Sequence, residues 1–202
     1  MKRKEKSFSF RFLFSIIWAV FSFSPESYSL NQASEKFSGR SIFNLRSTWT
    51  NQKAEKVEIS SLQGKKHLIA MIYTKCTATC PLIVQDLKNV LDGLKPKQKE
   101  NIKIDLFSFD SEFETQQSLI EFTKKHKIES PLWSVYYSNR GAVSELAATL
   151  EVQYKKLDSG VYMHSNILFL IDESGEVIAK QIGLGQSEAF LKEVNSKRLI
   201  AP

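Results

Sequence analysis

The sequence is poor in cysteine, histidine, glycine and proline, and it lacks a long apolar run. Its 202 residues include two cysteines, three histidines, eight glycines and five prolines. No internal repeat, low-complexity tract or Pro/Gly-rich hinge divides it, so the length predicts one domain. No apolar run reaches the roughly 20 residues that normally span a membrane. Any chemistry based on thiols or imidazoles therefore has few candidate residues.

The first 29 residues have the order of a secretory signal peptide. A basic start is followed by an uncharged, mostly apolar run of 12 residues from Phe12 to Phe23, and small residues precede Leu30. We expect an exported protein that faces the periplasm or an equivalent compartment, with residues 30–40 as a linker and 41–200 as the domain. An uncleaved inner-membrane anchor is the alternative. A lipoprotein anchor is not expected, because no cysteine lies near this segment.

The positive charge gives little support for nucleic-acid binding. The formal charge is +6, but residues 1–29 contain five basic and two acidic residues, so their removal leaves +3 (6 − 5 + 2). The remaining lysine clusters, at 95–99 and 124–127, lie beside acidic residues, which is typical of solvated faces. We expect no nucleic-acid partner and at most a weak preference for an acidic protein surface.

Strands and helices alternate along the domain. The expected strands are 41–49, 57–59, 68–73, 102–109, 132–136, 166–171 and 177–181, and the expected helices are 81–94, 115–126, 143–150 and one from about 187. Turns are expected at 62–65, 158–160 and 172–175. This order predicts an α/β fold, a thioredoxin-like mixed sheet with helices on both faces.

Cys76 and Cys80 lie between the apolar run 68–73 and the predicted helix. Free N–H groups at a helix N-terminus favour thiolates. Such a pair can close into a disulfide or bind a soft metal ion together, and simple packing of two buried cysteines is the remaining alternative. The spacing of four is expected to place both sulfurs on one side of a helical turn. A soft ion such as Cu(I) suits two thiolates and a third ligand.

Only three histidines can supply a nitrogen ligand. His67 lies at the far end of the predicted buried strand, about 20 Å from the cysteines if the chain is extended. His126 ends a lysine-rich helix, where a solvated position is expected. His164 lies in a predicted loop before the strand 166–171. If that strand lies beside the cysteine-bearing strand, the loop can place His164 opposite Cys76 and Cys80.

These motifs resemble the Sco/SenC family of thioredoxin-like copper chaperones for cytochrome c oxidase assembly. The resemblance covers residues 41–196 and rests on Tyr73-Thr74-Lys75-Cys76, Cys80-Pro81, His164-Ser165 leading into Phe169-Leu170-Ile171-Asp172, and the acidic segment Phe109-Asp110-Ser111-Glu112. It implies that Cys76, Cys80 and His164 bind copper. The chain departs from the family at Met163, where an acidic residue is common, and in the spacer Thr77-Ala78-Thr79, where a proline often follows the first cysteine. A packing role is expected for Met163, and a thioether ligand to Cu(I) is the alternative.

The resemblance implies a chaperone that delivers Cu(I) to the dinuclear copper centre in the copper-bearing subunit of cytochrome c oxidase. The alternative is a thiol–disulfide reductase in which Cys76 attacks, Cys80 resolves and oxidase cysteines are kept reduced. Outside the cytoplasm an isolated cysteine pair tends to oxidise, so a thiol reductant is an expected partner. A peroxidase is a weaker alternative, because Tyr73 stands where peroxiredoxins have a proline before their Thr-x-x-Cys motif.

Overall fold

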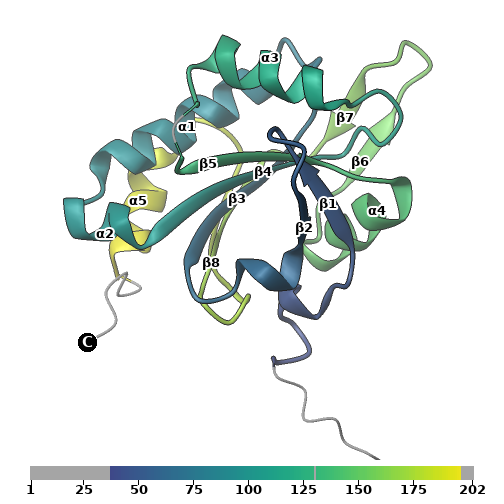
Figure 1. The fold of residues 1–202 in the computed structure, drawn as a ribbon. Helices are drawn as coiled ribbons and strands as arrows, with labels where there is room; N and C mark the ends of the chain where they lie inside the picture. Colours follow the sequence, from purple (N-terminus) through teal and green to yellow (C-terminus); the bar gives the residue numbers. More distant parts are fainter. Residues whose placement is uncertain (1–36, 130, 197–202) are drawn as a thin grey trace, which may run out of the picture. The chain divides into compact units, whose positions relative to one another are not determined.

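A seven-stranded mixed sheet forms the centre of the domain (Figure 1). The structure is a computed structural model, and it describes residues 37–129 and 131–196. The strand order is β2-β1-β5-β4-β3-β8-β9. The central strands β3 (Lys66–Ile72), β4 (Ile102–Ser108) and β5 (Trp133–Tyr137) are parallel. Antiparallel strands flank them, namely β1 (Thr48–Asn51), β2 (Lys56–Glu58), β8 (Ile167–Ile171) and β9 (Val177–Ile182). The predicted mixed α/β sheet is confirmed.

Helices cover both faces of this sheet. On β9, Gln181 donates to Asp86 of α1 (Cys80–Gly93) over 2.9 Å, whereas the adjacent Lys180 lies 3.7 Å from Glu151, just after α4 (Arg140–Thr149). Successive side chains of a strand point to opposite faces, so α1 and α4 cover opposite sides. Figure 1 shows α3 (Gln116–His126) and α5 (Ser187–Ser196) on the α1 side.

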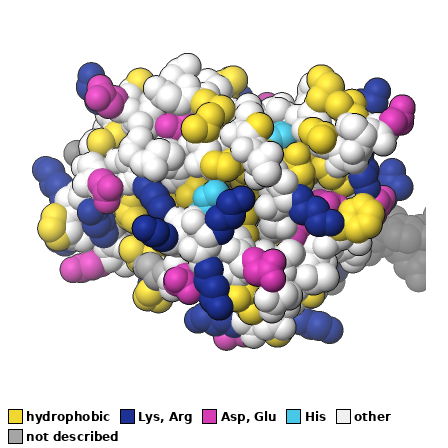
Figure 2. Space-filling view, turned by 90° about the horizontal axis from the view of Figure 1, so that it is seen from above, with side chains coloured by type: hydrophobic (Ala, Val, Ile, Leu, Met, Phe, Trp, Pro, Cys, Tyr) yellow, Lys and Arg dark blue, Asp and Glu magenta, His cyan; other side chains and the backbone are white. Residues whose placement is uncertain are grey.

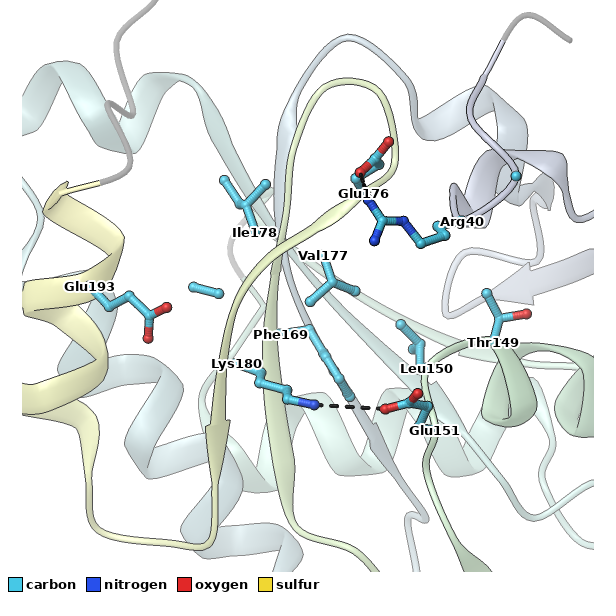
Figure 3. A pocket seen from close by; sticks show the side chains of 12 residues that line it. Arg40, Thr149, Leu150, Glu151, Phe169, Glu176, Val177, Ile178, Lys180 and Glu193 are labelled. Atoms are coloured by element: carbon cyan, nitrogen blue, oxygen red, sulfur yellow. Dashed lines mark ion pairs between the residues drawn. The ribbon is translucent and has the colours of Figure 1, made fainter.

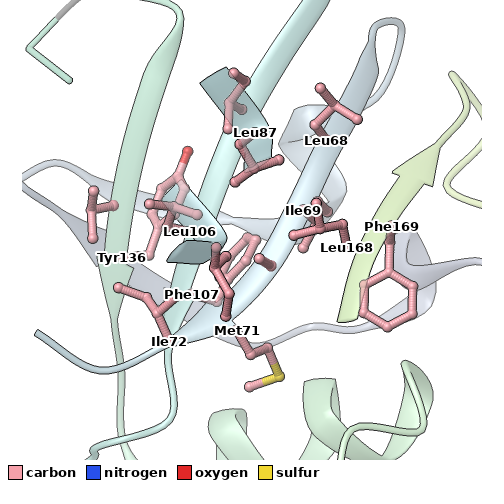
Figure 4. Close-up of a cluster of buried hydrophobic side chains, with 14 of the residues drawn as sticks. Leu68, Ile69, Met71, Ile72, Leu87, Leu106, Phe107, Tyr136, Leu168 and Phe169 are labelled. Carbon is pink, nitrogen blue, oxygen red and sulfur yellow. The ribbon is translucent and has the colours of Figure 1, made fainter. Parts of the chain in front are cut away.

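Strand β3 anchors the core. All seven of its residues are buried, and Figure 4 shows its side chains packed among those of β4, β8 and α1. Burial of each Leu or Ile side chain stabilises the fold by about 1.5–3 kcal/mol. The β3–β4 register pairs Ile72 with Ser108, so both strands end at the same edge of the sheet. The segment that carries the cysteines therefore starts from a rigid point at that edge.

Three polar side chains on adjacent strands interrupt the apolar core. Nδ1 of His67 contacts Asp105 Oδ2, and the Tyr136 hydroxyl donates to Asp105 Oδ1 over 3.0 Å. His67 Nε2 lies 2.8 Å from the carbonyl oxygen of Leu62, which can only accept, so Nε2 carries a hydrogen. His67 is thus a fully partnered core residue at the end of β3 away from the cysteines.

The N-terminal part of the domain differs from the sequence prediction. Residues predicted as one strand, 41–49, instead form the 3-10 helix η1 (Ile42–Asn44) followed by β1. The Ser41 hydroxyl accepts the N–H of Phe43 over 3.1 Å, and the N–H of Ile42 donates to the carbonyl of Gly175 over 2.9 Å. These bonds fold the segment against the β8–β9 hairpin. Ile59 likewise begins the 3-10 helix η2 (Ile59–Leu62) and does not end a strand.

Two short features escaped sequence prediction. One is the five-residue helix α2 (Pro96–Glu100), and the other is a separate two-stranded ribbon of β6 (Tyr154–Lys156) and β7 (Tyr162–His164). Elements of three to five residues are too short to show a hydrophobic period. The predicted turn 158–160 connects the two strands of the ribbon, with Gly160 at φ +79°. His164 therefore ends a strand, and the prediction that it lies in a loop was wrong.

Within residues 37–129 and 131–196, none of the helices combines the length and apolar character that crossing a bilayer requires. The predicted signal peptide, residues 1–29, lies outside the described residues, as does most of the predicted linker.

Candidate metal centre

Cys76 and Cys80 lie just beyond the C-terminal end of β3. Cys80 is the first residue of α1, while Cys76 lies in the irregular segment before it. The expectation that both sulfurs lie on one helical turn was therefore wrong. The N–H of Cys76 instead donates to the Tyr73 carbonyl over 3.2 Å, and the N–H of Cys80 donates to the Cys76 sulfur over 3.4 Å. This tight turn directs both buried thiols to the same place.

Glu114 holds the segment that leads to Cys76. Its two carboxylate oxygens accept the backbone N–H and the hydroxyl of Thr74, each over 2.7 Å. The Ser108 hydroxyl at the end of β4 donates to the same carboxylate over 2.8 Å. Sequence reasoning missed Glu114, because 40 residues separate it from Thr74 and no local pattern connects them. This carboxylate fixes the path of the chain between β3 and the first cysteine.

His164 reaches the cysteines from the ribbon. Its ring packs against Phe109 at 4.9 Å and Tyr73 at 6.2 Å between ring centroids. The ribbon is tied down by the hydroxyl of Tyr162, which donates to the buried carboxylate of Asp110 over 3.3 Å. The same carboxylate accepts the N–H groups of residues 112 and 113, so the acidic segment after β4 supports the ribbon.

The structure brings the three predicted residues together. The sulfurs of Cys76 and Cys80 and a ring nitrogen of His164 all lie within 4.8 Å of one another. The strand that follows His164, β8, lies directly beside β3, and this is the neighbour relationship that placing His164 opposite the cysteines required. His164 Nδ1 lies 3.2 Å from the carbonyl oxygen of Ser165, and Nε2 lies 3.1 Å from the hydroxyl of Thr79. Nε2 is therefore the nitrogen directed toward the cysteine segment.

The surroundings shift the pKa values of the two thiols in opposite directions. The Cys80 thiol and the backbone N–H groups of Cys80 and Ala78 point at the Cys76 sulfur, and they lower the pKa of Cys76 to about 3 against the opposing effect of burial. The pKa of Cys80 is raised, because its S–H donates to Cys76 and because it is buried. In the metal-free pair these contacts favour a thiolate at Cys76 and a thiol at Cys80.

The other candidate residues lie apart from this group. His126 is partly buried with its ring 4.4 Å from that of Phe122, so the expected solvated position was wrong. Burial and the nearby Lys125 and Lys88 lower the pKa of His126. Met163 is 62% exposed, so the expected packing role was wrong as well. Because Met163 and His164 are consecutive in β7, their side chains leave the ribbon on opposite faces.

An exposed aromatic residue and two lysines lie near the ribbon. The Phe113 ring is 53% exposed and lies 4.6 Å from the Lys75 ammonium and 4.4 Å from that of Lys156. Lys156 also pairs with Glu112. Figure 2 shows that histidine side chains on this view of the surface lie among hydrophobic and Lys/Arg side chains.

A hollow of about 650 Å³ lies elsewhere, between α4 and β9 (Figure 3). Apolar side chains such as Phe169 and Leu150 line it, and the Lys180–Glu151 pair lies at its edge. Neither cysteine nor histidine is among its lining residues. This hollow contributes nothing to the cysteine–histidine group.

The sheet order, the helix placement and the structural neighbours define a thioredoxin-like fold, with the cysteine pair at the end of β3. A family model described as SCO1/SenC matches residues 35–197, so the chain belongs to the SCO1/SenC family. The predicted family is confirmed.

Individual relatives are distant in sequence but share the fold. The chain is 25% identical to the SCO2-like protein of Rickettsia typhi over 134 residues, which is 63% of this chain and 64%, or just under two thirds, of that protein. ScoI of Bradyrhizobium japonicum, solved with copper bound, superposes with a TM-score of 0.62 at 22% identity over 76% of this chain and 96% of its own. BsSco is described as a member of the Sco family of cytochrome c oxidase assembly proteins with a disulfide switch. It superposes with a TM-score of 0.63 at 22% identity over 74% of this chain and 90% of its own.

Proposed function

We propose that the protein binds one Cu(I) ion through the sulfurs of Cys76 and Cys80 and through Nε2 of His164. The observation that carries the proposal is the meeting of these three donor atoms within 4.8 Å. Two sulfurs and one imidazole form a soft, three-donor set that suits trigonal Cu(I), whereas a structural zinc site normally uses four protein ligands. The donor set therefore fits the proposed ion.

The ion is cargo in this proposal. The protein delivers it by ligand exchange to the dinuclear copper centre in the copper-bearing subunit of a respiratory cytochrome c oxidase. Membership of the SCO1/SenC family supports this role, and so do the copper-bound ScoI relative and the assembly function given for BsSco. The exported location expected from residues 1–29 would place the centre on the periplasmic side, either free or anchored to the inner membrane.

The residues around the site prepare it for a soft ion. The lowered pKa of Cys76 favours its thiolate, so the proton that has to leave when the metal binds is that of Cys80. The ring of His164 packs against Phe109 and Tyr73, and its Nδ1 faces a carbonyl oxygen, so Nε2 is the nitrogen that can take the metal. The low pKa of Cys76 and the orientation of the His164 ring thus favour metal binding before copper arrives.

Cu(I) affinity of the His164→Ala variant tests the proposal. We expect competition with a chelator to show that Cu(I) affinity falls at least 10–100-fold. Loss of an outer-shell partner, which is a smaller change than loss of a ligand, typically costs that much affinity. His126→Ala is the matched control, because His126 lies on α3 outside the three-donor group. Wild-type affinity in His164→Ala would remove His164 from the site.

A thiol–disulfide reductase is the second candidate, and the low pKa of Cys76 beside the Cys80 thiol favours it. The two functions separate in a strain that carries only one variant. A copper carrier needs His164, so His164→Ala should impair oxidase assembly at limiting copper. A reductase needs only the dithiol, so His164→Ala should then be tolerated while Cys76→Ser is not. Either function requires a reductant that returns the pair to its dithiol form.

A further inference from the structure

The hydroxyl of Thr79 lies between two of the proposed copper ligands. It is 3.1 Å from His164 Nε2 and 3.8 Å from the Cys76 sulfur. Thr79 stands at the N-cap position of α1, where a threonine side chain commonly accepts a backbone N–H of the first turn. Here its side chain makes no such capping bond. The hydroxyl therefore contacts His164 and Cys76 and does not cap the helix.

The direction of the bond to His164 follows from the other ring nitrogen. Nδ1 faces the Ser165 carbonyl, which can only accept, so the tautomer that satisfies this contact carries its hydrogen on Nδ1. Nε2 then presents a lone pair, and the Thr79 O–H donates to it. This lone pair is the one that the proposed Cu(I) site requires. In the metal-free protein it is occupied by Thr79.

We propose that the Thr79 hydroxyl occupies His164 Nε2 in the metal-free protein and exchanges with copper there. This inference rests on the proposed function. When Cu(I) binds, the Oγ1–H···Nε2 hydrogen bond breaks and the metal–Nε2 bond forms. When Cu(I) leaves for a recipient ligand, the metal–Nε2 bond breaks and the hydrogen bond returns. No electron moves, and the proton stays on Thr79 throughout.

The direction of the effect follows from what else holds the ring. The bond from Nδ1 to the Ser165 carbonyl and the contacts with Phe109 and Tyr73 fix the orientation of His164 without Thr79. Loss of the hydroxyl therefore removes a competitor for Nε2 and leaves the ring in place. The other contact of the hydroxyl, at 3.8 Å from the Cys76 sulfur, is weaker than the 3.1 Å bond that it gives up when copper takes Nε2.

Thr79→Val is the appropriate variant, because it keeps the β-branched shape and removes the hydroxyl. A net hydrogen bond of ordinary strength corresponds to a change of about two- to tenfold. We expect Thr79→Val to bind Cu(I) tighter by that factor and to transfer it more slowly to the chelator bathocuproine disulfonate. Thr77→Val is the matched control, since Thr77 is an exposed residue of the same spacer. Thr79→Ser should keep wild-type behaviour.

A copper-independent measurement tests the hydrogen bond itself. The chain has three histidines, so the ring nitrogens can be assigned by ¹⁵N NMR of the metal-free protein above neutral pH. We expect the His164 Nε2 resonance to move downfield in Thr79→Val, toward that of a free lone pair, and to stay unchanged in Thr77→Val.

Each outcome decides a separate point. An unchanged Nε2 resonance in Thr79→Val, or a lower Cu(I) affinity, would overturn the inference and leave the copper site intact. If His164→Ala binds Cu(I) as the wild type does, the proposed function fails, and the exchange at Nε2 fails with it even where NMR detects the hydrogen bond. Tighter binding together with the downfield shift supports both.

Discussion

The backbone N–H of Cys80 points at the sulfur of Cys76 from 3.4 Å, at the first turn of α1. The sulfur thus accepts the N–H of the first helical residue, in the manner of a helix cap, and it lies near the positive end of the helix dipole. A thiolate gains more from this position than a thiol does, because negative charge is stabilised there. The same contact also draws together two residues that the helix alone would not pair, since Cys76 is not helical.

The low pKa of Cys76 predicts reactivity at acidic pH. A folded-state pKa below the ordinary value keeps the thiolate as pH falls, so alkylation of Cys76 by iodoacetamide should stay nearly constant from neutral pH down to about pH 5. An ordinary cysteine, with a pKa of about 8.5, loses reactivity roughly tenfold per pH unit over that range. Mass spectrometry of the reduced, metal-free protein identifies the modified residue. Reactivity that titrates near pH 8 would contradict the assignment, and the urea-unfolded chain is the control.

Oxidation should block metal binding. A disulfide between Cys76 and Cys80 removes both sulfur donors at once. We expect two free thiols per chain after reduction, none after mild oxidation, and a complete loss of Cu(I) uptake by the oxidised form. Re-reduction should restore uptake, which controls for damage to the fold. Copper uptake by the fully oxidised protein would show that the sulfurs are not the ligands.

The buried trio of His67, Asp105 and Tyr136 should matter for stability and not for copper. Replacement of His67 by Leu leaves the Asp105 carboxylate in the core with one partner, and loss of one member of a buried pair costs about 3–5 kcal/mol. Tyr136→Phe should cost about 1 kcal/mol, the value of an ordinary hydrogen bond. The free energy of unfolding in urea measures both. Joint replacement of His67 and Asp105 by Leu should be milder than His67→Leu alone, and equal or greater damage would argue against a buried pair.

Export predicts a defined mature N-terminus. The small residues before Leu30 lead us to expect that N-terminal sequencing of the exported protein begins near Leu30. An intact Met1 in the membrane fraction would instead show an uncleaved anchor. Retention of the whole pool in the cytoplasm would refute export altogether.

Long, periodic elements could be predicted from sequence because their signals are local. The apolar run 68–73 gave β3, and the stripe that includes Ile83 and Leu87 gave α1, each to within a few residues. The ribbon β6–β7 and the helix α2 could not be found this way, because three to five residues show no period and tertiary contacts decide their form. The prediction of a strand over 41–49 was wrong for a similar reason, because a hydrogen bond to Gly175, far along the chain, sets the conformation of this segment.

The sequence by itself determined the chemistry available: two thiols, three imidazoles, a strand-to-helix junction and a family motif that selected Cys76, Cys80 and His164. Only the tertiary structure decided the geometry. The antiparallel pairing of β8 with β3 and the ribbon tied to Asp110 bring His164 across 84 residues to the cysteines (164 − 80). Glu114 and Thr79 acquire roles at the site through contacts between distant segments. Such contacts depend on packing of the whole sheet, which no local pattern records.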